Sequence, residues 1–240
     1  MTTLFISDLH LDAKRPAITR AFLQFLTEEA QAATALYILG DLFEAWIGDD
    51  DDAPLALEVQ AALKAYSDGG KQLFFMAGNR DFLIGDDFCA NTGATLLTDP
   101  TPIDLYDRPT LLLHGDTLCT DDVEYQAFRA QARNPAWQAP LLAQPLPVRR
   151  QLAEKIRAET RSLAAMKAED IMDVNSAEVD RVMQANGVSL MIHGHTHRPA
   201  RHAVSAGERI VLGDWHTHLW FLRADETSLS LEQKAIEPPR

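Results

Sequence analysis

Seven side chains that can bind metal ions follow short apolar segments at five separate places in the chain. They are Asp8 and His10, Asp41, Asn79, His114, and His195 with His197. Two carboxylates, one amide and four imidazoles are too many donors for one tetrahedral ion, but they suit a pair of ions. Carboxylate and imidazole ligands without a thiolate favour Mn²⁺, Fe²⁺ or Zn²⁺ over a sulfur-rich structural zinc site.

A pair of divalent ions bridged by a carboxylate supports one kind of chemistry in particular. A carboxylate such as that of Asp41 can hold two cations about 3.5–4 Å apart, and this separation stabilises both reacting oxygens of a phosphoryl displacement. Metal binding also lowers the pKa of water to about 7, which supplies hydroxide at neutral pH. The residue types therefore predict metal-assisted hydrolysis at phosphorus.

The apolar segments before these side chains are typical of buried strands that alternate with helices. The expected strands cover residues 3–6, 36–39, 72–76, 110–113 and 189–192. Helical spacing of apolar residues lies between some of them, for example over residues 54–65. This alternation favours an α/β sheet architecture, in which ligands bind beyond the carboxyl ends of the strands. If the five strands lie side by side, all seven side chains meet at one edge of the sheet.

Residues 123–174 lack a strand pattern and are expected to form a helical cap, inserted into a core made of residues 1–122 and 175–240. Between Arg129 and Lys167, eight basic residues face two acidic ones, so this stretch has a net charge of +6 while the remainder of the chain has −19. This asymmetry predicts a local surface for an anionic partner. A solvated helix face is the alternative. The acidic run at residues 49–52 is expected to form a solvated loop or to lead into the next helix.

Composition excludes several other classes of protein. The chain has 240 residues, of which 46% are hydrophobic and 24% charged, as in a globular enzyme. Its net charge of −13 argues against general binding to nucleic acid. Two cysteines fit a reducing compartment, and every apolar run is shorter than the ~18 residues that span a bilayer. We therefore expect a cytoplasmic protein.

Five motifs resemble, in order and kind, those of the calcineurin-like metallophosphoesterases. They are Asp8-Leu9-His10, Gly40-Asp41, Gly78-Asn79-Arg80-Asp81, His114-Gly115-Asp116 and Gly194-His195-Thr196-His197. Longer segments around these motifs, together with residues 166–174, resemble the UDP-2,3-diacylglucosamine diphosphatases of lipid A synthesis within that superfamily. The resemblance implies a layered αββα core, a sandwich of two sheets flanked by helices, with a helical cap.

The same resemblance implies a site and a reaction. One metal ion is expected on Asp8, His10, Asp41 and His197, and a second on Asp41, Asn79, His114 and His195, with Asp41 shared. The family typically uses Mn²⁺. Water activated by the two ions attacks the α-phosphorus of the lipid nucleotide, and the products are UMP and 2,3-diacylglucosamine 1-phosphate. The residues expected to be catalytic are Asp41, Asn79, His114 and His195.

The resemblance also implies six substrate contacts. They are Asn79, Arg80, Asp122, Thr160, Lys167 and His195. Ala164 stands where relatives have an asparagine, so we assign it no role. Considered alone, Arg80 could instead pair with Asp81, and Asp122 could only cap the following helix. We expect His193 to pack in the core and take the repeated His-Thr-His at residues 216–218 as coincidence.

The cap is expected to be apolar as well as basic, which suits a lipid that carries a nucleotide diphosphate. Its predicted acyl-chain groove uses Trp137, Leu141, Leu142, Leu146, Ile156, Leu163 and Met166. The basic side of the cap predicts salt-sensitive, peripheral association with the cytoplasmic face of the inner membrane. We expect neither a nucleic acid nor a protein partner.

Two other functions fit part of the pattern. A phosphodiesterase for cyclic nucleotides, or a hydrolase of dinucleoside polyphosphates, can use the same core, but neither explains a cap that is both basic and apolar. A protein-binding scaffold with this fold is expected to have lost one or more metal ligands, and here all seven positions are filled.

Overall fold

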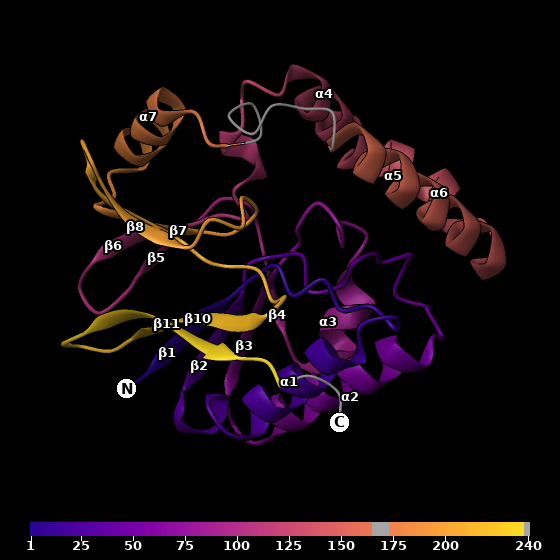
Figure 1. Ribbon diagram of the computed structural model, residues 1–240, viewed down its shortest axis with the longest axis horizontal. Coiled ribbons are helices and arrows are strands. Elements are labelled where there is room, and N and C mark those ends of the chain that lie inside the picture. The colour runs from indigo at the N-terminus through magenta and orange to yellow at the C-terminus, as the bar shows by residue number, and fades with distance from the viewer. Residues whose placement is uncertain (165–172, 238–240) are drawn as a thin grey trace.

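Two β-sheets lie face to face in the computed structural model, which describes residues 1–164 and 173–237, the stretch 161–164 by its backbone alone (Figure 1). One sheet runs in the order β11 (Leu229–Ala235), β10 (His218–Ala224), β1 (Thr3–Ile6), β2 (Ala35–Ile38), β3 (Gln72–Met76) and β4 (Thr95–Leu97). The other runs in the order β5 (Thr101–Asp104), β6 (Pro109–Leu112), β7 (Leu190–His193), β9 (Gly207–Val211) and β8 (Ala200–Val204). Both sheets mix parallel and antiparallel pairs.

Helices cover the outer face of each sheet, which gives the layer order helix, sheet, sheet, helix (Figure 1). The sheet that contains β1 carries α1 (Pro16–Thr27), the short 3-10 turn η1 (Ala30–Ala32), α2 (Pro54–Asp68) and α3 (Asp86–Thr92). The other sheet carries α7 (Ser176–Asn186). Proline opens α1 and α2 because the first helical position needs no N–H donor. The αββα architecture expected from the sequence is confirmed.

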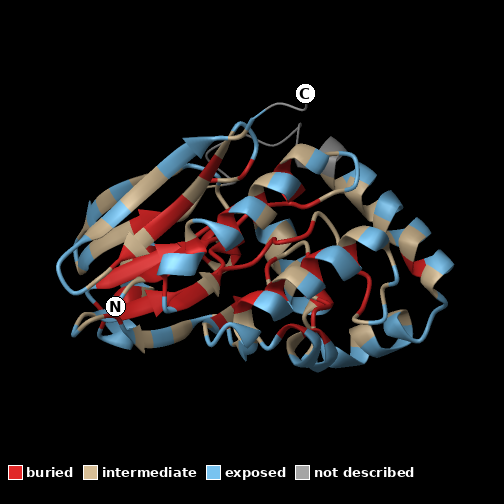
Figure 2. Cartoon of the chain, turned by 90° about the horizontal axis from the view of Figure 1, so that it is seen from below, coloured by how far each residue is buried: buried red, intermediate tan, exposed pale blue. Residues whose placement is uncertain are grey.

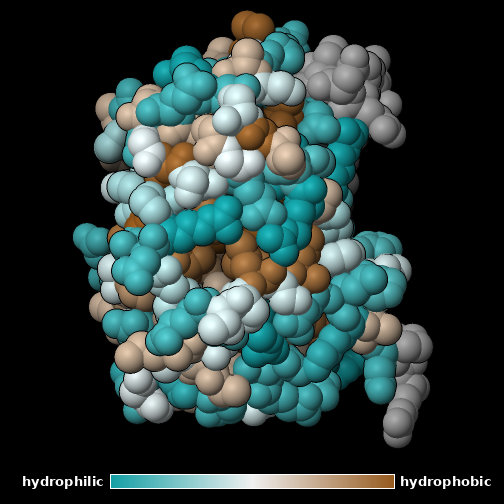
Figure 3. Space-filling model, turned by 90° about the vertical axis from the view of Figure 1, so that its left-hand side faces the viewer, coloured by the Kyte–Doolittle hydropathy of each residue, from teal (hydrophilic) through white to brown (hydrophobic). Residues whose placement is uncertain are grey.

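Three apolar layers follow from the alternation of side chains along the strands (Figure 2). Leu4 and Ile6 of β1 pack toward the helices, whereas Phe5 packs between the two sheets. A third layer lies between β6, β7 and α7. A strand covered on both faces is apolar along most of its length, which is why Leu4, Phe5 and Ile6 of β1 are consecutive apolar residues. On the side at the left of Figure 1, apolar surface gathers between the sheets within a largely hydrophilic face (Figure 3).

The strands that precede the predicted ligands divide between the two sheets. β1, β2 and β3 are parallel neighbours in one sheet, and β6 and β7 are parallel neighbours in the other. The prediction that all five lie side by side is therefore wrong, because a short apolar run does not encode which sheet it joins. The carboxyl ends of both sets nevertheless meet, and the N–H of His195 donates to Asp8 Oδ2 across the two sheets (2.9 Å).

After the 3-10 turn η2 (Asp116–Leu118), three helices project away from the sheets (Figure 1). They are α4 (Val123–Ala132), α5 (Pro135–Leu142) and α6 (Leu146–Ala164), and we call them the cap. Within the two described ranges, no helix has both the length and the apolar composition needed to cross a membrane.

The acidic run at residues 49–52 connects the core to the cap. Asp50 and Asp51 form ion pairs with Arg149 and Arg150 of α6 at 2.5 and 2.9 Å. Asp49 instead accepts hydrogen bonds within the core, from Trp46 Nε1 and from the N–H groups of residues 85 and 88. The run leads into α2, which is one of the two expectations for it, and the side chains of Asp50 and Asp52 are 61% and 70% exposed although arginines of α6 pair with them.

Candidate functional site

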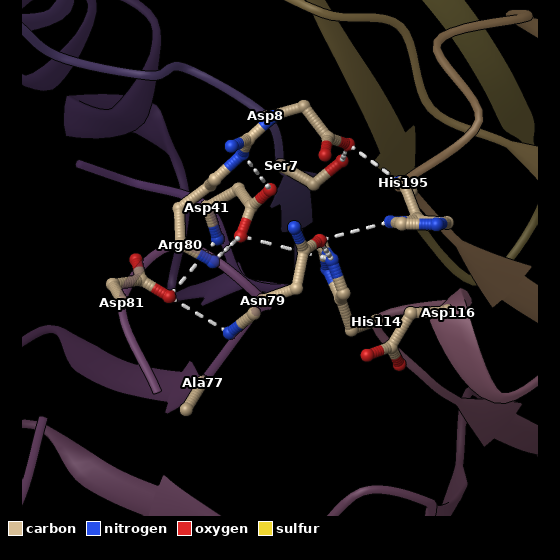
Figure 4. A network of polar contacts seen from close by, with 12 residues as sticks. Ser7, Asp8, Asp41, Ala77, Asn79, Arg80, Asp81, His114, Asp116 and His195 are labelled. Carbon is tan, nitrogen blue, oxygen red and sulfur yellow. Dashed lines mark hydrogen bonds and ion pairs between the residues drawn. The ribbon is translucent and has the colours of Figure 1, made fainter. Parts of the chain in front are cut away.

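The predicted ligand side chains converge where the two sheets meet, and Figure 4 shows five of them, Asp8, Asp41, Asn79, His114 and His195. His10 Nε2 lies 3.1 Å from His197 Nε2, and His197 Nε2 lies 3.5 Å from Asp8 Oδ1. On the other side of Asp41, His114 Nε2 lies 2.9 Å from Asn79 Oδ1. These contacts place two groups of donors next to each other.

Asp41 lies between the two groups, as a bridging ligand must. Its Oδ2 is 3.9 Å from His10 Nε2, and its Oδ1 is 3.7 Å from His114 Nε2. The second group is completed by His195, whose Nδ1 lies 2.9 Å from Asn79 Oδ1. All seven residues predicted as ligands thus surround one small volume, although they come from loops up to 189 residues apart.

The donor atoms fit divalent cations. One atom from each of Asp8, His10 and His197 can be chosen so that all three lie within 4.8 Å of one another, and the same holds for Asp8, Asp41 and His114. Asp8 Oδ1 is buried and accepts no hydrogen bond. A buried carboxylate oxygen without a donor is costly unless a cation neutralises it. Oxygen and imidazole donors in such groups suit Mn²⁺, Fe²⁺ or Zn²⁺.

The electrostatics of the metal-free site also favour cations. Burial alone would raise the pKa of Asp8, but the neighbouring imidazoles of His197, His114 and His10 hold it well below its usual range. Burial raises the pKa of Asp41 to about 7 against the attraction of His114. Burial alone would lower the pKa of His114, but the carboxylates of Asp41, Asp116 and Asp8 raise it to about 9. The histidine therefore holds a proton where a cation could sit.

The backbone of the ligand loops is strained. Among the described residues other than glycine, seven have a positive φ, and five of these are predicted ligands. Their φ values are 57° for Asp8, 48° for His10, 54° for Asp41, 68° for His195 and 55° for His197. This conformation costs L-residues about 1–2 kcal/mol each. Strain concentrated in this way is typical of functional sites.

Neighbouring groups fix the orientation of two ligands. Asp8 Oδ2 accepts the Ser7 hydroxyl at 2.5 Å as well as the His195 N–H, which leaves Oδ1 directed at the other ligands (Figure 4). His114 Nδ1 donates to the carbonyl of Leu39 at 2.9 Å, so Nε2 is the nitrogen that can give up its proton and bind a cation. Gly194 lies so close that a Cβ there would meet Asp8 Oδ2 at 2.2 Å.

Five of the six residues predicted to bind substrate line one cavity of about 590 Å³ next to the ligand cluster. They are Asn79, Arg80, Asp122, Thr160 and His195. Lys167 lies outside the described residues. Asp122 also accepts the N–H of Tyr125 at 3.1 Å and caps α4, so the helix-cap alternative applies as well.

Arg80 points toward the ligand cluster. Its Nε lies 4.0 Å from Asp41 Oδ2, and its Nε and Nη1 are buried without a hydrogen-bond partner. The alternative in which Arg80 pairs with Asp81 is wrong, because the Asp81 carboxylate accepts hydrogen bonds from backbone N–H groups instead. Two unpaired guanidinium nitrogens are donors suited to phosphate oxygens.

An apolar chamber adjoins this cavity between the core and the cap. Its core wall is Trp46, Ile47, Phe82 and Leu83, and its cap wall includes Trp137, Leu141, Leu152, Ala153 and Ile156. Arg80 and Ile156 line both spaces. Of the predicted groove, Leu142 and Leu146 do not line the chamber, and Met166 and the side chain of Leu163 lie outside what the structure describes. No motif in the sequence points to the core wall of the chamber.

Tyr125 is a site residue that the sequence analysis missed. Its ring stacks on His195, with centroids 5.9 Å apart, and its hydroxyl donates to Asp116 at 2.6 Å. Asp116 also accepts Arg129 Nε at 2.8 Å. Tyr125 belongs to none of the five motifs and is 70 residues from His195 in the sequence. Only the folded structure shows that the two side chains are in contact.

The basic residues of the cap are less available than predicted. Arg129 pairs with Asp116, and Arg133 Nη2 donates to the carbonyls of residues 77 and 78 beside Asn79. Arg149 and Arg150 pair with the acidic run. Half of the eight predicted residues therefore attach the cap to the core. His193 is fully buried and donates to the Gly194 carbonyl, in agreement with the expected packing role.

Comparisons with known proteins agree with this geometry. Residues 1–199 match the family model described as calcineurin-like phosphoesterase. A protein of Cellvibrio japonicus named UDP-2,3-diacylglucosamine hydrolase is 58% identical over 96% of this chain and 98% of its own. A protein of Stenotrophomonas maltophilia with the same name is 53% identical over 99% of this chain and 100% of its own.

Solved structures support the fold alone. An archaeal phosphodiesterase superposes with a TM-score of 0.50 and 12% identity over 98% of this chain and 99% of its own. A hypothetical protein of Pyrococcus horikoshii superposes with a TM-score of 0.52 and 12% identity over 100% of this chain and 89% of its own.

Proposed function

The chain belongs to the calcineurin-like phosphoesterase family, and we propose that it hydrolyses the diphosphate of UDP-2,3-diacylglucosamine to UMP and 2,3-diacylglucosamine 1-phosphate. Relatives of that name are 53–58% identical over nearly the full chain. The structural observation that carries the proposal is the junction of two spaces at Arg80 and Ile156. A polar cavity beside the ligand cluster and an apolar chamber suit the two ends of a lipid nucleotide.

Two divalent ions, with Mn²⁺ as the proposed metal, would be held by Asp8, His10, Asp41 and His197 and by Asp41, Asn79, His114 and His195. They would activate water and neutralise charge on the phosphoryl oxygens. The catalytic residues of the proposal are Asp41, Asn79, His114 and His195.

The chain itself orients the substrate. Arg80 has two buried nitrogens free for diphosphate oxygens, next to Asp41 and Asn79. Thr160 donates its hydroxyl to the Ile156 carbonyl at 2.7 Å, so its oxygen can still accept a hydrogen bond from a ligand. The ring of Tyr125 stacks on His195 and forms part of the cavity wall beside it. These residues hold the head group while the apolar chamber takes an acyl chain.

The proposed contacts of Asp122 and Lys167 complete the head-group site. Asp122 lies at the start of α4 and lines the polar cavity. A carboxylate at this place can accept a hydrogen bond from a sugar hydroxyl. Lys167 is proposed from the family resemblance alone.

We also propose peripheral association with the cytoplasmic face of the inner membrane. The supporting surface is the exposed side of α6, where Val148, which does not line the chamber, is 46% exposed. Lys155 on the same helix has a 72% exposed side chain. Apolar and cationic side chains together suit an anionic lipid surface. Flotation with anionic liposomes tests this: Val148→Glu should weaken binding, and unchanged flotation would count against it.

Product analysis tests the proposed reaction. Metal-free protein is supplied with Mn²⁺ and offered UDP-2,3-diacylglucosamine or a cyclic nucleotide. Release of UMP from the lipid substrate, abolished by chelation and restored by Mn²⁺, is the expected result. Turnover of the cyclic nucleotide alone would favour the phosphodiesterase alternative. Normal function of His10→Ala and His114→Ala variants would favour a scaffold.

A further inference from the structure

Asp81 follows the proposed ligand Asn79 by two residues, is fully buried, and accepts hydrogen bonds from two loops (Figure 4). The donors are the N–H groups of Gly78 (2.7 Å) and Asp41 (3.2 Å) to Oδ1, and those of Leu42 (2.7 Å) and Phe43 (3.4 Å) to Oδ2. One carboxylate thus joins the backbone of the loop that carries Asp41 to that of the loop that carries Asn79.

The β-sheet does not make this connection. Pairing between β2 and β3 ends at Ile38 and Phe75, before either loop begins. Three of the four donors come from the consecutive residues 41–43, and Asp41 has a φ of 54°. Consecutive N–H groups around a left-handed residue form a concave site for an anion. Asp81 supplies that anion from within the chain.

The two loops are in direct contact, so their relative placement matters. A Cβ added at Gly78 would lie 2.2 Å from Asp41 Oδ1. The same oxygen accepts the N–H of Arg80 at 2.8 Å. A shift of either loop would therefore move Asp41 relative to Asn79 and change the distances between donors of the proposed metal site.

We propose that Asp81 is a positioning residue that fixes the Asp41 and Asn79 loops against each other and thereby sets the affinity of the site for divalent ions. Both of its oxygens face backbone donors, so it acts through Asp41 and Asn79. This inference rests on the proposed function, since the loops are those of the proposed ligands.

The chemistry of the side chain makes Asp81→Asn informative. An amide has one acceptor oxygen, and its NH₂ group would face N–H donors that need an acceptor. The loops would separate on the side of the amide nitrogen. Loss of an outer group that orients metal ligands typically weakens metal binding about 10–100-fold.

Asp49 offers a matched control. Its carboxylate accepts Trp46 Nε1 at 2.9 Å and the N–H groups of Gly85 and Phe88 at 3.1 and 3.0 Å. Trp46 lies five residues after Asp41 and Gly85 lies six residues after Asn79, so these donors belong to the same two connections but lie farther from the proposed metal ligands. Asp49→Asn therefore removes a similar set of hydrogen bonds elsewhere in the core.

The experiment titrates Mn²⁺ into the metal-free full chain and follows free Mn²⁺ by electron paramagnetic resonance, with thermal denaturation of each protein. We expect Asp49→Asn to lower the Tm and keep the Mn²⁺ affinity, and Asp81→Asn to bind Mn²⁺ about 10–100-fold more weakly while folded. Equal affinity of Asp81→Asn and the parent chain, or an equal loss in Asp49→Asn, would overturn the inference. A parent chain that binds no Mn²⁺ would instead overturn the proposed metal site.

A second measurement applies if Asp81→Asn does not fold. Amide hydrogen exchange is followed in the metal-free parent chain. The N–H groups of Asp41, Leu42 and Gly78 should exchange as slowly as those of the β2–β3 ladder, because Asp81 holds them without metal. Rapid exchange of these three amides in a folded chain would also overturn the inference.

Discussion

Arg149 of α6 and Asp50 of the core are joined by two hydrogen bonds of 2.7 and 2.5 Å between guanidinium and carboxylate. Arg149 also donates to the carbonyls of Ile47 and Gln144 at 2.5 and 2.8 Å, and only 4% of its surface is exposed. It lines the apolar chamber as well. This arginine therefore fixes the cap to the core at the wall of the proposed acyl site.

Replacement of Arg149 by glutamine should destabilise the protein. The change leaves two carbonyls without their donor, at a cost of about 1–3 kcal/mol. For a chain of this size the Tm should fall by about 2–12 °C. The matched control is Arg150→Gln, because Arg150 pairs with Asp51 at the surface and exposed ion pairs contribute little. Thermal denaturation of both variants checks this, and equal Tm losses would contradict it.

Removal of an aromatic side chain from the chamber should affect long-acyl substrates selectively. Trp137 contributes to the cap wall and lies 6.3 Å, between ring centroids, from Phe82 of the core wall. Trp137→Ala should raise the KM for a long-acyl substrate about tenfold, which corresponds to about 1.4 kcal/mol of lost apolar contact. The KM for a short-acyl analogue should change little.

Leu142→Ala is the control for this prediction. Leu142 lies on the same helix, α5, but is 38% exposed and does not line the chamber. Steady-state kinetics with substrates of two acyl lengths compares the variants. A similar KM increase for both acyl lengths in Trp137→Ala would place the acyl chain elsewhere.

Backbone strain at the ligand loops should reverse the usual order of stability of glycine and alanine variants at residue 197. At ordinary positions alanine is more stable than glycine by about 0.5–1 kcal/mol. His197 has a φ of 55°, where a Cβ costs about 1–2 kcal/mol. His197→Gly should therefore be more stable than His197→Ala in the metal-free protein. Urea denaturation measures both, and greater stability of the alanine variant would show that this φ is not kept.

Asp225 should make stability depend on pH at the acid end. This carboxylate accepts four hydrogen bonds of 2.8 Å from Thr227 and Ser228 in the β10–β11 turn. The hydrogen bond from the Thr227 N–H, with those of the two hydroxyls, lowers its pKa to about 2. Because the pKa is lower when folded, the stabilisation is present above the unfolded value of about 3.8 and is lost as the pH falls toward 2.

The measurement compares the thermal stability of the parent chain with that of Asp225→Ala between about pH 6 and 2. The difference should stay constant down to about pH 4 and then shrink. A difference that does not change over this range would mean that the turn does not bind the ionised carboxylate.

The sequence predicts those features of the site that depend on neighbouring residues, and it does not predict those that depend on contacts between distant residues. Each proposed ligand follows its own strand within a few residues, so strand ends and residue types were enough to identify them. Asp50 and Arg149 are 99 residues apart, and charge alone does not distinguish a paired side chain from a solvated one. The left-handed backbone conformation of Asp8 and His10 could not be predicted either, because glycine is the residue that clearly indicates a positive φ in a sequence.

The fold shows the same division. A continuous apolar run predicted β1, because both faces of that strand are covered. The allocation of β6 and β7 to a separate sheet depends on contacts between distant strands, such as that of β7 with β9. Such strand pairing depends on the packing of the whole chain, so the sequence of a single segment does not predict it.

The position of β1 between β2 and β10 has a consequence for synthesis on the ribosome. β2 emerges soon after β1, but β10 begins only at His218. Until then the nascent chain carries an unpaired strand edge in its first sheet, a site where strands of other chains can add. Early chaperone contact, or slow translation before residue 218, would thus change the yield of folded protein more than changes in the cap.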